Sequence, residues 1–133
     1  MTKSILIIDD NDLLRTVLVD ILEGLTYQVF EACNGKEGIE FFRKNPTDIV
    51  ITDIFMPEKD GLEVITELRR DYPQLKIIAI SGLGKGSTDF LNTAKLLGAS
   101  HYLMKPFNPR DIVELVSQLL SEIPAGDMDR ELA

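Results

Sequence analysis

The chain has 133 residues, of which 44% are hydrophobic and 27% charged, a size and composition that predict one globular domain. Its formal net charge of −8 argues against a broad binding surface for DNA or RNA, and no hydrophobic run approaches the ~20 residues of a membrane span. The only cysteine, Cys33, excludes an internal disulfide, fits a reducing cytoplasm and is expected to pack as a small apolar residue.

The first half of the chain alternates continuous apolar runs with segments of helical periodicity. Continuous apolar runs are typical of strands buried on both faces of a parallel sheet. They predict strands at residues 4–8, 27–32 and 48–52. Apolar residues at helical spacing predict helices at residues 13–25 and 36–44. Asn11 and Asp12 are both candidates for the N-cap of the first helix, and Pro46 prevents the second from continuing.

The same alternation continues through the second half of the chain. It predicts strands at residues 75–80 and 101–104. It predicts helices at residues 61–71, from the end of a Gly-rich loop (82–86) to about 97, and from 108 or 109 to about 121 or 123. Gly98 is the expected C-terminal stop of the middle helix of these three. We therefore expect a domain at residues 1–123, followed at 124–133 by an acidic tail or the start of a linker.

Five strand–helix units in regular alternation predict the fold class. Short loops between alternating strands and helices imply a parallel sheet with helices on both faces. Right-handed crossovers then make a doubly wound sheet. A closed barrel of eight such units needs ~250 residues, which this chain does not have. The sequence thus predicts an α/β fold with five helices and a doubly wound, five-stranded parallel sheet. If the strand order is 2-1-3-4-5, as the family resemblance given below implies, the first and third strands are neighbours at the point where the order reverses.

Polar residues follow or end four of the predicted strands. Asp9 and Asp10 follow the first strand, Asp53 the third, Ser81 the fourth and Lys105 the fifth. The C-terminal ends of parallel strands lie at one edge of the sheet, where ligands bind in this fold class. Adjacent strands are ~4.8 Å apart, so carboxylates on the first and third strands can share a cation, and a long lysine can reach inward from two strands away. We expect these five residues to form one site.

This combination of side chains suits phosphoryl transfer. Three carboxylates repel one another, and a bound Mg²⁺, which prefers oxygen ligands, would offset that repulsion. An ammonium and a hydroxyl can then orient the oxygens of an incoming phosphoryl group, and an aspartate can be its nucleophile. Each residue alone also has an ordinary structural explanation as a helix cap, a loop carboxylate, a turn serine or a solvated lysine. Because all of these residues are expected at one edge of the sheet, we favour the interpretation that they form a functional site.

Four segments carry a resemblance to a known family. They are ILIIDDN (5–11), DIVITDIFMPEKDG (48–61), IIAISG (77–82) and YLMKPF (102–107). With them the chain resembles the CheY-like receiver domain of two-component response regulators, from about Lys3 to Leu120. The resemblance implies that Asp53 accepts a phosphoryl group from the phosphohistidine of a sensor histidine kinase or phosphotransfer protein, in a Mg²⁺-dependent reaction. It implies no enzyme activity beyond the domain's own aspartyl phosphorylation and dephosphorylation.

The resemblance also assigns roles to single residues, each by its place in these motifs. Asp9 and Asp10 match the acidic metal-binding pair, with Asp10 as the expected direct ligand, beside Asp53 itself. Phe55 matches the position whose backbone oxygen binds the metal. The remaining matches are the switch serine, the motif lysine, its cis-proline and the switch aromatic: Ser81, Lys105, Pro106 and Tyr102. Tyr102 is equally well explained, without the motif, as a half-buried strand aromatic.

The resemblance places signal output at the face formed by the fourth helix, the fifth strand and the fifth helix, which is expected to bind a second copy of the chain or a target protein.

The chain departs from the family at Gly82, where many members have alanine. Phe55 and Leu83 are apolar at two positions that tune hydrolysis of the aspartyl phosphate in this family. A polar side chain there can help to place the attacking water, so we expect slow autodephosphorylation.

Other functions for the same sheet edge fit less well. The stretch GLGKG (82–86) lacks the Ser or Thr that follows the lysine of a phosphate-binding loop, and Ser87 breaks the dinucleotide fingerprint. An FMN binder on this fold would not need the carboxylate set. An Asp-nucleophile phosphatase usually has D-x-D, whereas Phe55 stands in the last place here. A docking module that works without phosphorylation would be expected to lack a site residue. The last two remain the alternative functions.

Overall fold

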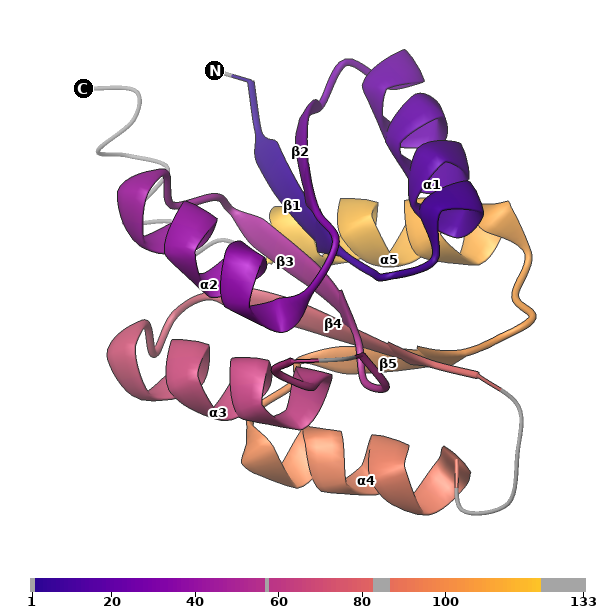
Figure 1. The fold of residues 1–133 in the computed structure, drawn as a ribbon. Coiled ribbons are helices and arrows are strands. Elements are labelled where there is room, and N and C mark those ends of the chain that lie inside the picture. Colours follow the sequence, from indigo (N-terminus) through magenta and orange to yellow (C-terminus); the bar gives the residue numbers. More distant parts are fainter. Residues whose placement is uncertain (1, 57, 83–86, 123–133) are drawn as a thin grey trace.

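The computed structural model describes residues 2–56, 58–82 and 87–122, and Figure 1 shows its arrangement of strands and helices. Five strands form the sheet: β1 (Ser4–Ile8), β2 (Gln28–Ala32), β3 (Ile49–Asp53), β4 (Lys76–Ser81) and β5 (His101–Met104). Five helices alternate with them: α1 (Asp12–Gly24), α2 (Gly35–Lys44), α3 (Gly61–Asp71), α4 (Ser87–Leu97) and α5 (Pro109–Ser121). The expected tail and Leu83 lie outside the described residues.

The sheet confirms the predicted fold class and strand order. All strand pairs are parallel, and their order is β2-β1-β3-β4-β5. Helices α1 and α5 cover one face, and α2, α3 and α4 cover the other (Figure 1). The order reverses between β1 and β3, which are hydrogen-bonded neighbours. In doubly wound sheets this is where ligands bind.

Alternate residues of each inner strand supply two separate cores. In β1, Ile5 and Ile7 pack with residues of α1 and α5, whereas Leu6 and Ile8 pack with residues of α2, α3 and α4. All five residues of β3, the middle strand, are buried. Burial on both faces explains why these strands are continuous apolar runs. No helix in the described part of the chain is both long enough and apolar enough to cross a membrane.

Three strands, β2, β3 and β4, differ from the prediction by one residue at one or both ends. β3 begins at Ile49, the first of its residues to pair with β1, and the Asp48 side chain before it accepts a hydrogen bond from the Ser4 backbone N–H at 2.8 Å. β3 includes Asp53, which pairs with Ile80, so the expected acceptor lies within the ladder. β4 likewise runs one residue further, to Ser81, which pairs with Met104. Pairing with neighbouring strands, rather than the end of the apolar run, decides where each strand stops.

The helices begin within about one residue of the positions predicted from the sequence. Asn11, and not Asp12, is the N-cap of α1, because its side chain accepts a hydrogen bond from the Leu14 N–H. Asn108 is the N-cap of α5 and forms a capping box with Asp111. Such caps satisfy amide groups that have no partner within the helix. The last helix ends at Ser121.

The prediction for Cys33 is wrong. Cys33 follows the end of β2 and is exposed, and its Sγ donates a hydrogen bond to Glu37 Oε2 at 3.0 Å. The hydrogen bond to Glu37 raises the pKa of the Cys33 thiol. Because β2 ends at Ala32, which takes the last buried place, the next side chain falls in the turn before α2 and does not reach the core.

Arg69 joins the ends of α3 and α4. Its Nε and Nη2 donate to the Gly98 carbonyl at 3.0 and 2.7 Å, and its Nη1 donates to the Pro73 carbonyl at 2.7 Å. Gly98 has a φ of +127°, which disfavours other residues there. Burial lowers the pKa of Arg69. The guanidinium thus satisfies carbonyls that the helix ends leave without partners.

We expect Arg69→Ala to lower the free energy of unfolding by about 2 kcal/mol, because several charge-assisted hydrogen bonds are lost together. Urea unfolding measures this. Arg70→Ala is the matched control: Arg70 is next in sequence but its side chain is 66% exposed and pairs with Asp71 at the surface. The control should change stability little. Equal effects of the two substitutions would contradict the role of Arg69.

Candidate phosphoacceptor site

The five residues that the sequence predicts for one site do come to one edge of the sheet. Asp9 follows β1, and Asp53 and Ser81 are the last residues of β3 and β4. Lys105 follows β5 directly. Asp10 comes next after Asp9, before α1 begins. The edge is therefore built from four strands that are far apart in the sequence, and only the parallel pairing brings their ends together.

Three carboxylates form the centre of this edge. Asp9, Asp10 and Asp53 each offer an oxygen, and these oxygens all lie within 4.8 Å of one another. Asp9 and Asp53 are buried, with 1% and 5% of their surface exposed, whereas Asp10 is exposed. Lys105 reaches them: its Nζ lies 3.4 Å from Asp9 Oδ2 and 3.4 Å from Asp53 Oδ2. The cluster thus has two buried acids, one solvent-facing acid and one cation.

Backbone amides orient the two buried carboxylates. The Asn11 N–H donates to Asp9 Oδ1 at 2.9 Å, and the Ile54 N–H donates to Asp53 Oδ1 at 2.9 Å. In each case the other oxygen faces Lys105. Burial, and then the nearby charge of Asp9, raise the pKa of Asp53 to about 6, against the opposing effects of Lys105 and the Ile54 amide. At pH 7 and above Asp53 is mostly ionised and available as a nucleophile.

Ser81 has a buried hydroxyl that finds no hydrogen-bond partner among the described residues. The residue is 0% exposed, and its Oγ makes no hydrogen bond within the described ranges. Its backbone carbonyl accepts from the Lys105 N–H at 2.6 Å, which ties the serine to the lysine. A buried hydroxyl without a partner costs about 1–3 kcal/mol, so such a group calls for an explanation. Binding of an anionic oxygen acceptor at this edge would satisfy it.

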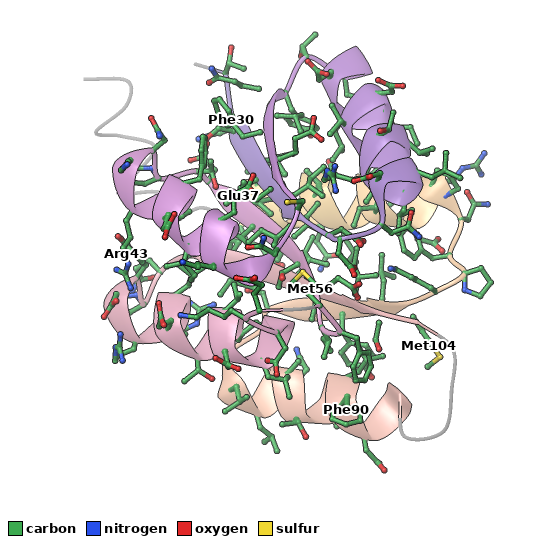
Figure 2. All side chains as sticks on the ribbon, in the orientation of Figure 1. Phe30, Glu37, Arg43, Met56, Phe90 and Met104 are labelled. Carbon is green, nitrogen blue, oxygen red and sulfur yellow. The ribbon has the colours of Figure 1, made fainter. Side chains whose placement is uncertain are left out.

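The other predicted residues surround this centre. Phe55 is 49% exposed, and its ring packs edge-to-face on Phe90 of α4, with the ring centroids 4.9 Å apart. Tyr102 lies on the edge strand β5 and is 39% exposed. The Lys105–Pro106 peptide bond is cis, the isomer that the family resemblance implies. Figure 2 shows Phe90 on the side of the molecule where Met104 ends β5.

Sequence reasoning missed two contributors to the site. Phe90 is the ring partner of Phe55, and Arg15 donates a hydrogen bond to the Asp9 carbonyl at 2.6 Å. Neither residue falls at a strand end, so the pattern that located the acids and the lysine gave no signal for them.

A shallow groove of about 260 Å³ lies beside Lys105. It is lined by Asn11, Leu14, Lys105, Pro106 and Phe107.

The donor set of the cluster fits a hard cation. Its three side chains offer only carboxylate oxygens, which Mg²⁺ prefers, and no histidine or cysteine belongs to the cluster. The exposed position of Asp10 leaves room for the water ligands that Mg²⁺ keeps. Acidic groups alone are a weak sign of a metal site. Here the buried hydroxyl of Ser81 at the same edge, which has no partner in the described part of the chain, supports a site for an anion beside a cation.

Comparisons with known proteins agree on one family. The family profile of the response regulator receiver domain matches residues 5–117. The chemotaxis protein CheY of Thermotoga maritima is 37% identical over 120 residues, which cover 90% of this chain and 98% of that protein. The transcriptional regulatory protein SrrA of Staphylococcus aureus is 36% identical over 120 residues, so this chain matches about half (48%) of its length.

Solved structures give the same result for the fold. A CheY-like receiver domain protein from Methanospirillum hungatei has a TM-score of 0.84 at 30% identity and covers 92% of this chain and 96% of its own. A receiver domain protein from Clostridium thermocellum has a TM-score of 0.83 at 29% identity, over 90% and 94% of the two chains. Sequence, fold and the composition of the sheet edge thus agree, and the chain belongs to the response regulator receiver domain family of two-component signalling.

Proposed function

We propose that Asp53 accepts a phosphoryl group from the phosphohistidine of a sensor histidine kinase or a phosphotransfer protein, in a reaction that depends on Mg²⁺. The observation that carries this proposal is the meeting of Asp9, Asp10 and Asp53 within 4.8 Å, with Lys105 Nζ 3.4 Å from Asp53 Oδ2. An ionised nucleophile, a cation and a metal-binding acid pair are the parts that phosphoryl transfer needs, since its catalysis is mainly positioning and charge stabilisation.

In the proposed reaction a carboxylate oxygen of Asp53 attacks the phosphorus, the bond from phosphorus to the imidazole nitrogen breaks, and its electron pair stays on the imidazole. Mg²⁺, held by Asp9, Asp10, Asp53 and the Phe55 backbone oxygen, would supply positive charge next to the transferred oxygens. The Lys105 ammonium neutralises part of the same charge. The Ser81 hydroxyl, which has no partner among the described residues, donates to a phosphoryl oxygen.

Phosphorylation of the purified chain by acetyl phosphate with Mg²⁺ tests this function. Mass spectrometry is expected to show one added phosphate on the wild type and none on Asp53→Asn. Asp20→Asn, which changes an exposed acid on α1, is the matched control and should be phosphorylated like the wild type. A phosphate on Asp53→Asn, or none on the wild type, would refute the proposal.

Signal output would follow from a shift of Ser81 and Lys105 toward the phosphoryl group, with Tyr102 moving inward. A shift from 1:99 to 99:1 needs about 5.5 kcal/mol of differential interaction, which a few charge-assisted hydrogen bonds can supply. The changed face would be α4, β5 and α5, and its partner a second copy or a target protein. We propose that the chain acts in the cytoplasm, contacts no nucleic acid itself and catalyses only its own aspartyl phosphorylation and dephosphorylation.

Slow autodephosphorylation is the second part of the proposal. The Phe55 ring, packed on Phe90, offers no group that could place a water molecule. We expect Phe55→Asn to shorten the lifetime of the aspartyl phosphate about tenfold, or about 1.4 kcal/mol in barrier, because an amide can orient the attacking water. Decay of the phosphorylated species after removal of the donor measures it. Leu96→Asn, at an exposed apolar residue of α4, is the control. An unchanged lifetime in Phe55→Asn would contradict the role of the ring.

A further inference from the structure

Arg15 of α1 joins three segments next to the acid cluster. Its Nη1 donates to the Asp9 carbonyl at 2.6 Å, its Nε to Glu31 Oε1 of β2 at 2.8 Å, and its Nη2 to Asp12 Oδ1 at 2.6 Å. The Arg15 side chain is only 13% exposed, although it carries a full charge. Each of its three nitrogens therefore has a different partner, and one of these partners is the backbone of a predicted metal ligand.

The contact with the Asp9 carbonyl acts on both acids of the pair. This carbonyl belongs to the peptide plane that links Asp9 to Asp10, and a peptide unit is rigid. The peptide unit that precedes it is held by β-ladder contacts, with the Asp9 N–H donating to the Ala32 carbonyl at 3.1 Å. The Asn11 N–H donates to the Asp9 side chain at 2.9 Å. The Arg15 hydrogen bond adds to these contacts by fixing the Asp9–Asp10 peptide unit, which ends at the Cα that carries the exposed Asp10 carboxylate.

The charge of Arg15 does not explain its place beside the site. A cation near three carboxylates would by itself repel Mg²⁺ and weaken its binding. Its charge is offset by two carboxylates, Asp12 and Glu31, which are 84% and 50% exposed and so need no partner for their own solvation. The hydrogen bonds to these acids raise the pKa of the guanidinium. What the two acids provide is a fixed orientation of the guanidinium, with Nη1 aimed at the Asp9 carbonyl.

We propose that Arg15 is a positioning residue of the phosphoacceptor site: by holding the Asp9–Asp10 peptide plane it keeps both carboxylates in the arrangement that binds Mg²⁺. This inference rests on the Mg²⁺ site proposed above. Residues that hold metal ligands in place typically contribute 10–100-fold to metal affinity. A positioning role and a purely electrostatic role predict opposite signs for a neutral substitution, because removing a positive charge alone would tighten Mg²⁺ binding.

Isothermal titration of the unphosphorylated chain with Mg²⁺ tests the proposal. Arg15→Met keeps much of the length of the side chain but removes the donors and the charge, and is expected to raise the Mg²⁺ dissociation constant about tenfold or more. The matched control is Arg43→Met. Arg43 also bridges two carboxylates, Glu67 and Asp71, but it lies at the end of α2, across the molecule from Met104 at the end of β5 (Figure 2). The control should bind Mg²⁺ within twofold of the wild type.

A second readout separates positioning from folding. Phosphorylation of Arg15→Met by acetyl phosphate is expected to need about tenfold more Mg²⁺ for half of the maximal rate, and to approach the wild-type rate at saturating Mg²⁺. A dissociation constant that is unchanged or lower in Arg15→Met overturns the proposal. If Arg15→Met does not fold, Arg15→Gln replaces it, because glutamine is also neutral and too short to span the same contacts. A positioning role predicts a higher Mg²⁺ dissociation constant for Arg15→Gln, whereas a purely electrostatic role predicts a lower one. Absence of Mg²⁺ binding in the wild type would instead refute the proposed metal site itself.

Discussion

Gly61→Ala is expected to lower the free energy of unfolding by about 3 kcal/mol and to impair phosphorylation of the chain. Gly61 is the first residue of α3, and its N–H donates to the Ile54 carbonyl at 2.7 Å. A Cβ at this position would lie 2.1 Å from the Asp53 carbonyl oxygen and 2.6 Å from the Ile54 Cα. Both are backbone atoms, which cannot rotate away as a side chain can. The chain must therefore shift at the proposed phosphoacceptor.

Urea unfolding and phosphorylation by acetyl phosphate measure the two effects of Gly61→Ala. Gly24→Ala is the control, because Gly24 ends α1 and a Cβ there would have no atom within 4 Å. Alanine is the better helix former, so the control is expected to leave stability unchanged or to raise it by up to about 1 kcal/mol. Unfolding of Gly61→Ala at the wild-type urea concentration would show that the loop after Asp53 is not packed as closely as described.

Asp53→Asn is expected to stabilise the metal-free domain by about 3 kcal/mol at pH 8 and by little at pH 4. Burial raises the pKa of Asp53 from 3.8 to about 6. Between these values the folded chain binds more protons than the unfolded chain, so stability falls as pH rises through this window. Above about pH 7 the whole cost of the buried charge is present, and a gap of about two pH units corresponds to about 3 kcal/mol. Asparagine carries no charge and avoids that cost.

Urea unfolding in EDTA at pH 4 and pH 8 measures this difference. Asp71→Asn is a control of opposite sign, since Arg70 and Arg43 lower the pKa of Asp71 to about 2 and its charge is favourable. That variant should gain no stability at either pH. Added Mg²⁺ is expected to stabilise the wild type more than Asp53→Asn, because a ligand that binds only the folded state stabilises it. Equal stability of the wild type and Asp53→Asn at pH 8 would contradict a buried charge at this position.

The sequence alone was enough for the fold class and for the prediction that Asp9, Asp10, Asp53, Ser81 and Lys105 lie at one edge of the sheet. Buried strands are apolar on both faces, so five runs of this kind, alternating with helical segments, predicted the doubly wound parallel sheet that the structure has. The strand order itself was implied by the family resemblance. Parallel strands end at one edge, so Asp9, Asp53, Ser81 and Lys105 were expected to meet there. Local patterns sufficed because the requirements are local: an apolar run, a cap or a polar residue at the end of a strand.

Tertiary contacts decided the properties that give these residues their chemistry. Burial in the folded chain raises the pKa of Asp53, and no local sequence pattern measures burial at a strand end. Three features depend on how the elements pack and not on a local pattern: the Ser81 hydroxyl, which has no hydrogen-bond partner among the described residues, the Arg15 contact with the Asp9 carbonyl, and the close approach of Gly61 to Asp53. Sequence reasoning also failed for Cys33, because its side chain is of a type that suits a core but its position falls in a turn, where it is exposed. The sequence by itself determined which side chains stand at the edge of the sheet. Packing decided which of them are buried and which are paired, because burial and pairing depend on neighbours that only the folded chain supplies.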